Sequence, residues 1–274
     1  MKKYKKRLFI FMIILLILII IYNIINNNRV KVVTQDVVIN NLPDSFDNFT
    51  ILQISDLHGK VFGKEQSNLA KIINNLDYDM IAITGDMQDR LNPTLEPLLQ
   101  LLDKIENKEN IFYIPGNHGP DYNEDIKNRG AISLETAKEI KKGEDSIWVY
   151  DFFGESGFTN GVSHIDNNDI KIAVTHYPWN EDFYKSAPDR IGEYDLVLAG
   201  HYHGGQVRIP FYGAIFVPDI NEPIYFPDQN LVSGLNTYGR YNQYVSRGLG
   251  ASGKYGFRIF NTPEINLITL KKGS

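Results

Sequence analysis

Five short polar motifs are the part of this sequence that could do chemistry. In chain order they are Asp56-Leu57-His58, Gly85-Asp86, Gly116-Asn117-His118, Thr175-His176 and Gly200-His201-Tyr202-His203, and they contain five of the six histidines. Imidazole nitrogens combined with carboxylate and amide oxygens are ligands for divalent ions such as Mn, Fe, Zn, Co or Ni. Two such ions held side by side can activate water and bind the oxygens of a phosphate ester. The motifs therefore indicate a site with two metals.

Each motif follows a short apolar run, and we expect these runs to be buried strands. The runs are Phe49–Ser55, Met80–Thr84, Ile111–Ile114, Ile170–Thr175 and Leu196–Ala199. Loops beyond the carboxyl ends of such strands converge over one crevice, which would gather the ligands. In an extended segment residues i and i+2 point the same way, so Asp56 and His58, or His201 and His203, could face one centre. Gly85, Gly116 and Gly200 would allow sharp turns without a Cβ clash.

Segments with helical periodicity lie between the first three of these strands. Lys64–Leu76 and Thr94–Ile105 have helical spacing, which predicts a βαβαβ sheet with helical cover. Before these helices, Val37–Asn40 is predicted to be a strand. After them, the sequence predicts a helix over Leu134–Lys142, an extended segment over Ile147–Phe153 and a loop over residues 154–168. Short β-like pieces follow residue 205, up to Tyr255–Phe260 and Ile265–Leu270. We expect one α/β (α+β) catalytic domain, a β-sandwich flanked by helices, over residues 29–274.

The N-terminal segment is a candidate membrane anchor. Lys2, Lys3, Lys5, Lys6 and Arg7 precede an almost unbroken apolar run, Leu8–Ile25. As a helix its 18 residues would span roughly 27 Å, close to the ~30 Å hydrocarbon thickness of a bilayer. A buried core helix and a cleaved signal peptide are alternatives, but no small-x-small cleavage site follows. We therefore expect residues 1–28 to be a basic tail and a single transmembrane helix, with the cations on the cytoplasmic side of the cell membrane and the domain outside.

Composition restricts the partners. There is no cysteine, so thiolate metal sites and disulfides are excluded. Without the five cations of the tail, 23 Lys and Arg face 33 Asp and Glu, a net charge of −10 for residues 8–274. An acidic domain is a poor electrostatic partner for nucleic acid, which is therefore not an expected substrate. The sequence leaves the oligomeric state open.

The ordered motifs D-x-H, G-D, G-N-H, H and G-H-x-H resemble those of the calcineurin-like metallophosphoesterases. Within that family, Gly200–Pro210, Arg247–Gly250 and Pro263–Ile265 are similar to a membrane-anchored bacterial branch. The resemblance implies that Asp56, His58 and His203 hold one metal, that Asn117, His176 and His201 hold the other, and that Asp86 is shared. It also implies that His118 is not a ligand but protonates the leaving oxygen or stabilises charge on the phosphoryl group. The resemblance favours Mn as the metal. A hydroxide bridging the two metals would attack phosphorus.

The expected function is that of a phosphodiesterase, phosphomonoesterase or pyrophosphatase at the outer membrane face. The anchor favours lipid-linked or envelope substrates by proximity, and a phosphorylated small molecule is the alternative. Two rivals are a metal-dependent amidohydrolase and a non-catalytic envelope binding module. Gly119 follows His118 where an acidic residue is common in the family, and Tyr202 lies inside the last motif. Arg208 and Arg247 could contact phosphate or serve packing, and the nearby aromatic residues Tyr122, Tyr177, Trp179 and Tyr202 could bind substrate or line the pocket.

Overall fold

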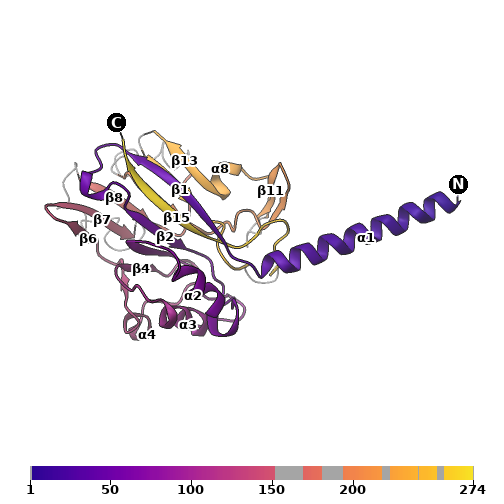
Figure 1. The fold of residues 1–274 in the computed structure, drawn as a ribbon, viewed down its shortest axis with the longest axis horizontal. Coiled ribbons are helices and arrows are strands. Elements are labelled where there is room, and N and C mark those ends of the chain that lie inside the picture. The colour runs from indigo at the N-terminus through magenta and orange to yellow at the C-terminus, as the bar shows by residue number, and fades with distance from the viewer. Residues whose placement is uncertain are drawn as a thin grey trace.

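Two six-stranded sheets pack face to face in a computed structural model that describes residues 2–151, 169–180, 194–217, 223–239, 241–251 and 256–273. The first sheet has the order β1-β15-β2-β3-β4-β5 and the second has the order β13-β14-β9-β8-β7-β6. The sandwich predicted from the sequence is therefore confirmed. Its helices α2, α3 and α4 lie together on the side of the first sheet that faces away from the second (Figure 1).

The first sheet contains the alternating strands that the sequence predicts. Strands β2, β3, β4 and β5 are parallel, while β15 runs antiparallel to β2 and parallel to the edge strand β1. The bounds are β1 Lys31–Ile39, β2 Thr50–Ile54, β3 Met80–Thr84, β4 Ile111–Ile114, β5 Ala131–Ser133 and β15 Glu264–Lys272; the helical segments between them are η1 Asp44–Phe46, η2 Lys64–Gln66, α2 Ser67–Ile73, α3 Glu96–Lys104 and α4 Glu124–Lys127.

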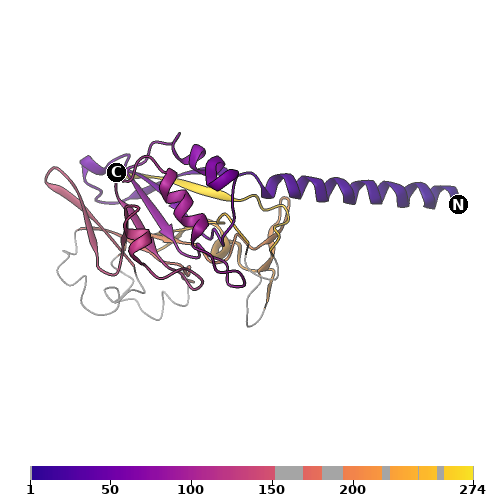
Figure 2. The same ribbon diagram turned by 90° about the horizontal axis from the view of Figure 1, so that it is seen from below.

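The second sheet has a parallel centre, β14-β9-β8-β7, with antiparallel strands at both edges. A small third sheet, β10-β11-β12, and the short helix α8 lie near the domain end of α1 (Figures 1 and 2). The bounds are β6 Lys138–Lys142, β7 Asp145–Asp151, β8 Ile170–Val174, β9 Leu196–Ala199, β10 Val207–Ile209, β11 Gly213–Val217, β12 Ile224–Tyr225, α8 Gln229–Val232, β13 Gly234–Tyr238 and β14 Tyr241–Val245.

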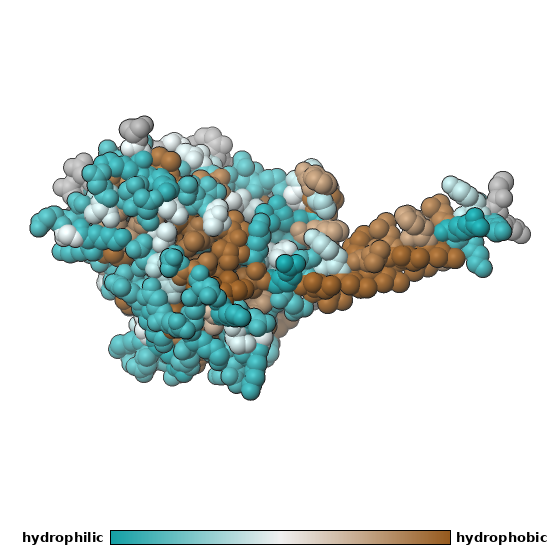
Figure 3. Space-filling model, viewed as in Figure 1, coloured by the Kyte–Doolittle hydropathy of each residue, from teal (hydrophilic) through white to brown (hydrophobic). Residues whose placement is uncertain are grey.

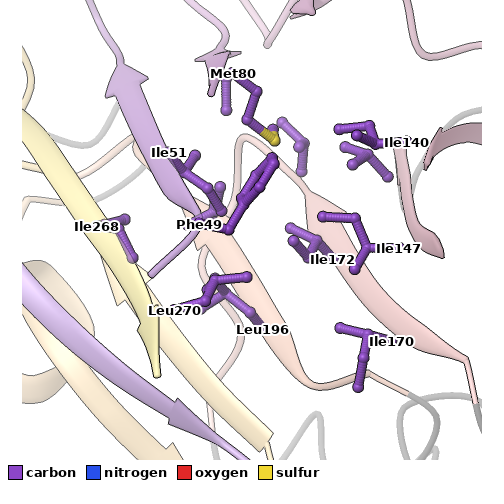
Figure 4. Packing of buried hydrophobic residues seen from close by; sticks show 14 of the residues in the cluster. Phe49, Ile51, Met80, Ile140, Ile147, Ile170, Ile172, Leu196, Ile268 and Leu270 are labelled. Carbon is purple, nitrogen blue, oxygen red and sulfur yellow. The ribbon is translucent and has the colours of Figure 1, made fainter. Parts of the chain in front are cut away.

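Burial explains why the central strands read as continuous apolar runs. All five residues of β3 and all five of β8 are buried, as expected for parallel strands covered on both faces. One core fills the space between the two sheets, where Phe49, Ile51 and Met80 meet Ile147 and Ile172 (Figure 4). A second core lies between the first sheet and its helices. These two layers hold the carboxyl ends of the central strands in fixed positions.

The helix predicted over Leu134–Lys142 is wrong. Lys138–Lys142 forms β6, which pairs antiparallel with β7. Leu134, Ala137 and Ile140 recur every three residues and so resemble a helical face, but the hairpin buries Ile140 in the core between the sheets instead. Gly143 has a φ of 65°, which permits the tight connection. The predicted loop at 154–168 lies outside the described residues. Residues 256–260 form no strand beyond an isolated bridge between Ile259 and Val207.

The N-terminal helix α1, Lys2–Asn27, projects away from the domain as one straight rod (Figure 1). It is long and apolar enough to cross a membrane, and none of its apolar window is buried in the protein. Figure 3 shows this apolar surface between a polar tip and the domain. The alternative of a buried core helix is therefore wrong. After α1 the chain passes almost directly into β1.

Candidate metal centre

The polar motifs meet where the carboxyl ends of parallel strands from both sheets come together. Asp56, Asp86 and Asn117 follow β2, β3 and β4 of the first sheet, while His176 and His201 follow β8 and β9 of the second. Hydrogen bonds join the sheets at this end, and two of them run from a side chain to a backbone carbonyl. His176 Nδ1 donates to Thr84 O at 2.9 Å, and Gln53 Nε2 donates to Ala199 O at 2.8 Å.

Five of the predicted ligand residues have left-handed backbone conformations. The φ values are 50° for Asp56, 47° for His58, 55° for Asp86, 75° for His201 and 50° for His203. Residues other than glycine rarely adopt positive φ, and such conformations cluster at functional sites. The expectation that Asp56–His58 and His201–His203 are extended is thus wrong. Their side chains face one centre because the backbone turns sharply at each of these residues.

Asp56, His58 and His203 form the first group of candidate ligands. All three are buried, and their ligand atoms lie within 4.8 Å of one another. The Nε2 atoms of His58 and His203 each lie 3.9 Å from Asp56 Oδ1. Asp56 is held by the Ser55 hydroxyl, which donates to Oδ2 at 2.6 Å, and by the backbone N–H of His201.

Asn117, His176 and His201 form the second group. His201 Nδ1 lies 3.2 Å from Asn117 Oδ1 and 3.2 Å from His176 Nε2. Because the Nδ1–H of His176 donates to Thr84 O, its Nε2 keeps a lone pair directed at the group. Asn117 is exposed and His201 half-buried, so this side of the centre opens to solvent.

Asp86 lies between the two groups. Its Oδ2 is 3.6 Å from His58 Nε2 in the first group and 3.3 Å from His176 Nε2 in the second. Its Oδ1 accepts a 2.7 Å hydrogen bond from the backbone N–H of His118. A carboxylate in this position can serve two cations at once, as required of the shared ligand in a two-metal site.

Burial and charge set the protonation of these groups. Burial raises the pKa of Asp56 to about 6, and the charge of Asp86 adds to this effect. Burial lowers the pKa of His58 to about 4 and that of His203 well below its usual value. Burial also opposes charge on His176, yet the hydrogen bond to Asp86 and the nearby carboxylates raise its pKa above the usual value. His58 and His203 are therefore neutral near pH 7, which is the form that binds metal.

The donor set fits divalent cations. Both ring nitrogens of His58 and Nδ1 of His203 are buried, and within the described part of the chain none of these atoms has a hydrogen-bond partner. A buried polar atom without a partner is costly, and a metal ion would satisfy those that face the centre. Nitrogen and oxygen donors without thiolates suit Mn, Fe, Zn, Co or Ni.

His118 lies beside the first group without belonging to it. Its ring centroid is 6.3 Å from that of His58, and the residue is half-buried. Its backbone N–H donates to Asp86, which ties the loop that carries the ring to the candidate site. Gly200 allows the last motif to approach Ser55 and Asp56 closely, because a Cβ there would lie 2.5 Å from Asp56 Oδ2.

Arg258 is a supporting residue that the sequence interpretation missed. It is 1% exposed and donates to five backbone carbonyls, those of Asn261, Gly248, Gly250, His203 and Arg247. The guanidinium thus ties the turn that carries His203 to the 247–250 loop, which packs on Asp56 through Gly248. Burial lowers the pKa of Arg258 to about 10. The only sequence signal is a cation inside the apolar run Phe257–Phe260.

The other candidate substrate contacts divide into two kinds. The ring centroid of Tyr177 lies 4.3 Å from that of His201, and that of Tyr202 lies 4.9 Å from it, so both tyrosines border the second group. Trp179 is buried and packs against Tyr194, and Tyr122 packs against Tyr113. The side chain of Arg208 donates to the Gly204 carbonyl and that of Arg247 lies 3.6 Å from Glu264, so both guanidinium groups have polar partners within the protein.

Comparison with known proteins gives a consistent result. Residues 49–205, which include both groups and Asp86, match the family described as calcineurin-like phosphoesterase. Similar proteins are the metallophosphoesterase YkuE of Bacillus subtilis, 28% identical over 84% of this chain and 82% of that protein, and the phosphodiesterase YaeI of Escherichia coli, 33% identical over 36% and 32% of the two chains. A transmembrane protein with metallophosphoesterase domain from Bos taurus is 23% identical over 64% of this chain and 45% of that protein.

Proposed function

Because the chain belongs to the calcineurin-like phosphoesterase family, whose members use divalent metals to hydrolyse phosphoric esters, we propose that it cleaves its ester through a dinuclear centre at the outer face of the cell membrane. The observation that carries the dinuclear centre is the position of Asp86. Its Oδ2 lies within 3.6 Å of a histidine nitrogen from each ligand group. The substrate of the protein is a phosphomonoester, a phosphodiester or a pyrophosphate.

The ligand groups define the proposed assignment. Asp56, His58 and His203 hold one cation, Asn117, His176 and His201 hold the other, and Asp86 is shared. Manganese is our first choice, with Fe, Zn, Co or Ni compatible with the same donors. When bound, the two cations supply the charge that makes a water acidic near neutral pH and that offsets the charge developing on the phosphoryl oxygens.

His118 has a separate role in this proposal. It is the half-buried imidazole outside both groups, and it projects from the loop that Asp86 holds. From there it donates a proton to the leaving oxygen or stabilises the negative charge on the phosphoryl group. Tyr177 and Tyr202 beside His201 form one wall of the substrate pocket.

The location rests on α1 and on the charges before it. Residues 1–28 form the basic tail and a single-pass anchor, and residues 29–274 form the catalytic domain. Five cations precede the apolar run, so the N-terminus faces the cytoplasm and the domain lies outside. This location brings a lipid-linked phosphoester within reach. Protease added to intact cells is expected to digest the domain, and a protected full-length chain would refute the orientation.

A direct test uses the purified full chain in detergent with Mn²⁺ and a chromogenic phosphodiester. We expect hydrolysis with about two metals per chain, and Asp86→Asn should lose both activity and at least one metal. Asp103→Asn, which removes a carboxylate from the surface of α3, is the matched control and should retain both. Failure across several metals and ester types would overturn the proposal.

A further inference from the structure

The small sheet β10-β11-β12 and its turns carry exposed aromatic side chains. Outside α1, six aromatic residues are exposed in the described part of the chain: Phe211, Tyr212, Tyr225 and Phe226 on this sheet and its turns, Phe257 on the neighbouring segment, and Tyr177 beside the candidate metal centre. We call the first four of these residues the aromatic patch. Exposed apolar residues that occur singly are ordinary, but a group of them indicates an interaction site.

The aromatic patch belongs to a folded layer of the domain. The ring centroids of Tyr212 and Phe226 are 6.2 Å apart with the rings nearly perpendicular, so the β10–β11 turn contacts the end of β12. Ala214 and Val217 of β11 are buried in an apolar cluster with Val232 of α8. The sheet therefore buries part of its own apolar surface within the domain and exposes the patch.

Phe211 occupies a turn position that favours glycine. The backbone N–H of Tyr212 donates to Ile209 O at 3.2 Å, which closes a β-turn with Phe211 at its third residue, where φ is 69°. Glycine or asparagine is preferred at such a position, and a bulky residue there is strained. The side chain of Phe211 is fully exposed, so burial within the domain does not offset this strain. An apolar environment outside the protein would bury the ring.

Backbone hydrogen bonds join this sheet to the segment that packs on α1. The N–H of Arg208 in β10 donates to Ile259 O at 2.9 Å. The next residue, Phe260, donates its backbone N–H to Asn23 Oδ1 of α1 at 2.7 Å, and its ring centroid lies 5.6 Å from that of Tyr22. The small sheet consequently lies near the domain end of α1 in both ribbon views (Figures 1 and 2).

The apolar run of α1 extends alongside this edge of the domain. Ile19 and Ile20 line one cavity together with Phe257. They precede the end of the run at Ile25 by five or six residues, or roughly 8 Å at ~1.5 Å per residue. The run Leu8–Ile25 spans roughly 27 Å, no more than the ~30 Å of hydrocarbon in a bilayer. A bilayer that covers the whole run therefore also reaches the segment around Phe257 and the sheet paired with it.

Resting on the proposal that α1 spans the membrane, we propose that the aromatic patch and Phe257 lie in the interface of the same bilayer and form a second membrane contact. Aromatic side chains favour the boundary between hydrocarbon and water. The domain has a net charge of −10, so apolar contact rather than charge provides the attraction to the lipid. The two contacts together fix the orientation of the domain on the membrane.

The test uses the absence of cysteine, because a single introduced cysteine can then be labelled specifically. Tyr212→Cys places the label in the aromatic patch, at a residue that is 55% exposed. The control Val38→Cys places it at a residue that is 58% exposed, seven residues along β1 from Lys31 and roughly 23 Å from the start of that strand at ~3.3 Å per residue. Tyr225→Cys on β12 repeats the test if Tyr212→Cys does not fold.

Each full-length variant carries the environment-sensitive fluorophore NBD and is reconstituted into phosphatidylcholine vesicles with or without a nitroxide-labelled lipid. We expect the label of Tyr212→Cys to emit further to the blue and to lose intensity to the nitroxide lipid, whereas the label of Val38→Cys should do neither.

Equal responses at the two positions would overturn the inference. A response at residue 212 that rises with the ratio of protein to lipid and not with the nitroxide lipid would assign the patch to contact between copies, which also overturns it. Ester hydrolysis is measured on the same samples, so an active protein without lipid contact at residue 212 leaves the proposed function intact. A chain that does not float with the vesicles would overturn the anchor and this inference together.

Discussion

A methyl group on Gly200 would strike the carboxylate that holds the first ligand group together. The added Cβ would lie 2.0 Å from Ser55 Oγ and 2.5 Å from Asp56 Oδ2. The Ser55 hydroxyl can rotate away, but it then loses its 2.6 Å hydrogen bond to Asp56. The carboxylate oxygen itself must retreat by about 0.5 to 0.9 Å, whereas metal–ligand distances hold to about 0.2 Å. Gly200→Ala is therefore expected to lose the metal of this group.

The stability cost of Gly200→Ala should be modest, about 1 to 3 kcal/mol, as for other overpacked sites. A folded domain commonly has about 5 to 15 kcal/mol of stability, so the variant should remain folded. A misplacement of this size in the reacting groups costs about 100-fold in kcat/KM, or about 2.7 kcal/mol. The expected combination is a folded protein with fewer bound metals and little activity.

The assay measures bound metal per chain, thermal unfolding and kcat/KM on a chromogenic phosphodiester. Gly143→Ala is the matched control, because Gly143 has a φ of 65° but no atom lies within 4 Å of the point that an added Cβ would occupy. That variant should lose about 1 to 2 kcal/mol of stability through its backbone alone and keep its metals. If Gly200→Ala retained two metals and wild-type activity, the close packing of Gly200 on Asp56 would be refuted.

Three further predictions address other parts of the centre. His118→Gln should keep both metals and lower kcat by about 10² to 10⁴, which metal analysis beside steady-state kinetics will show; loss of metal would instead make His118 a ligand. Metal affinity should fall as the pH drops through about 6, because burial raises the pKa of Asp56 to about that value and its carboxyl must lose a proton to bind a metal. The ring of His58, with a pKa of about 4, takes up a competing proton only at lower pH. Titration calorimetry from pH 5 to 8 measures this affinity, and a flat profile would contradict the prediction. Arg258→Met should reduce the free energy of unfolding by about 3 kcal/mol or more, since buried carbonyls lose their donor at about 1 to 3 kcal/mol each, and denaturant unfolding should show a smaller loss for Arg208→Met.

The central strands could be predicted from the sequence because their burial is complete. Met80–Thr84 and Leu196–Ala199 match β3 and β9 to the residue, since a strand covered on both faces leaves an unbroken apolar run. The edge strand β1 starts at Lys31, well before the predicted Val37, because it pairs with β15 from Lys31 onward. This start was missed because none of its first six residues is buried and they include Gln35 and Asp36. Strand β6 was missed because Leu134, Ala137 and Ile140 recur at helical spacing, whereas the extended segment predicted at Ile147–Phe153 overlaps β7.

The motifs predict which residues make up the candidate site, but they do not predict how these residues are arranged in space. Residue types identify Asp86 as a carboxylate after a strand, but only the packing of two sheets places its Oδ2 beside His176. The left-handed backbone at Asp56 and His58 could not be predicted from the sequence, because Asp and His tolerate this conformation better than most residues but adopt it only where the local turn and its packing require it. The role of Arg258 depends on carbonyls up to 55 residues away and is invisible to local patterns.

The pairing of β1 with β15 has a consequence for how the domain withstands mechanical force. Strand β1 follows α1 almost directly, and its nine residues pair in register with Glu264–Lys272 of β15. Force applied to α1 along the direction of β1 would act along this ladder, so its nine registered pairs would be loaded together in shear and would not open one pair at a time.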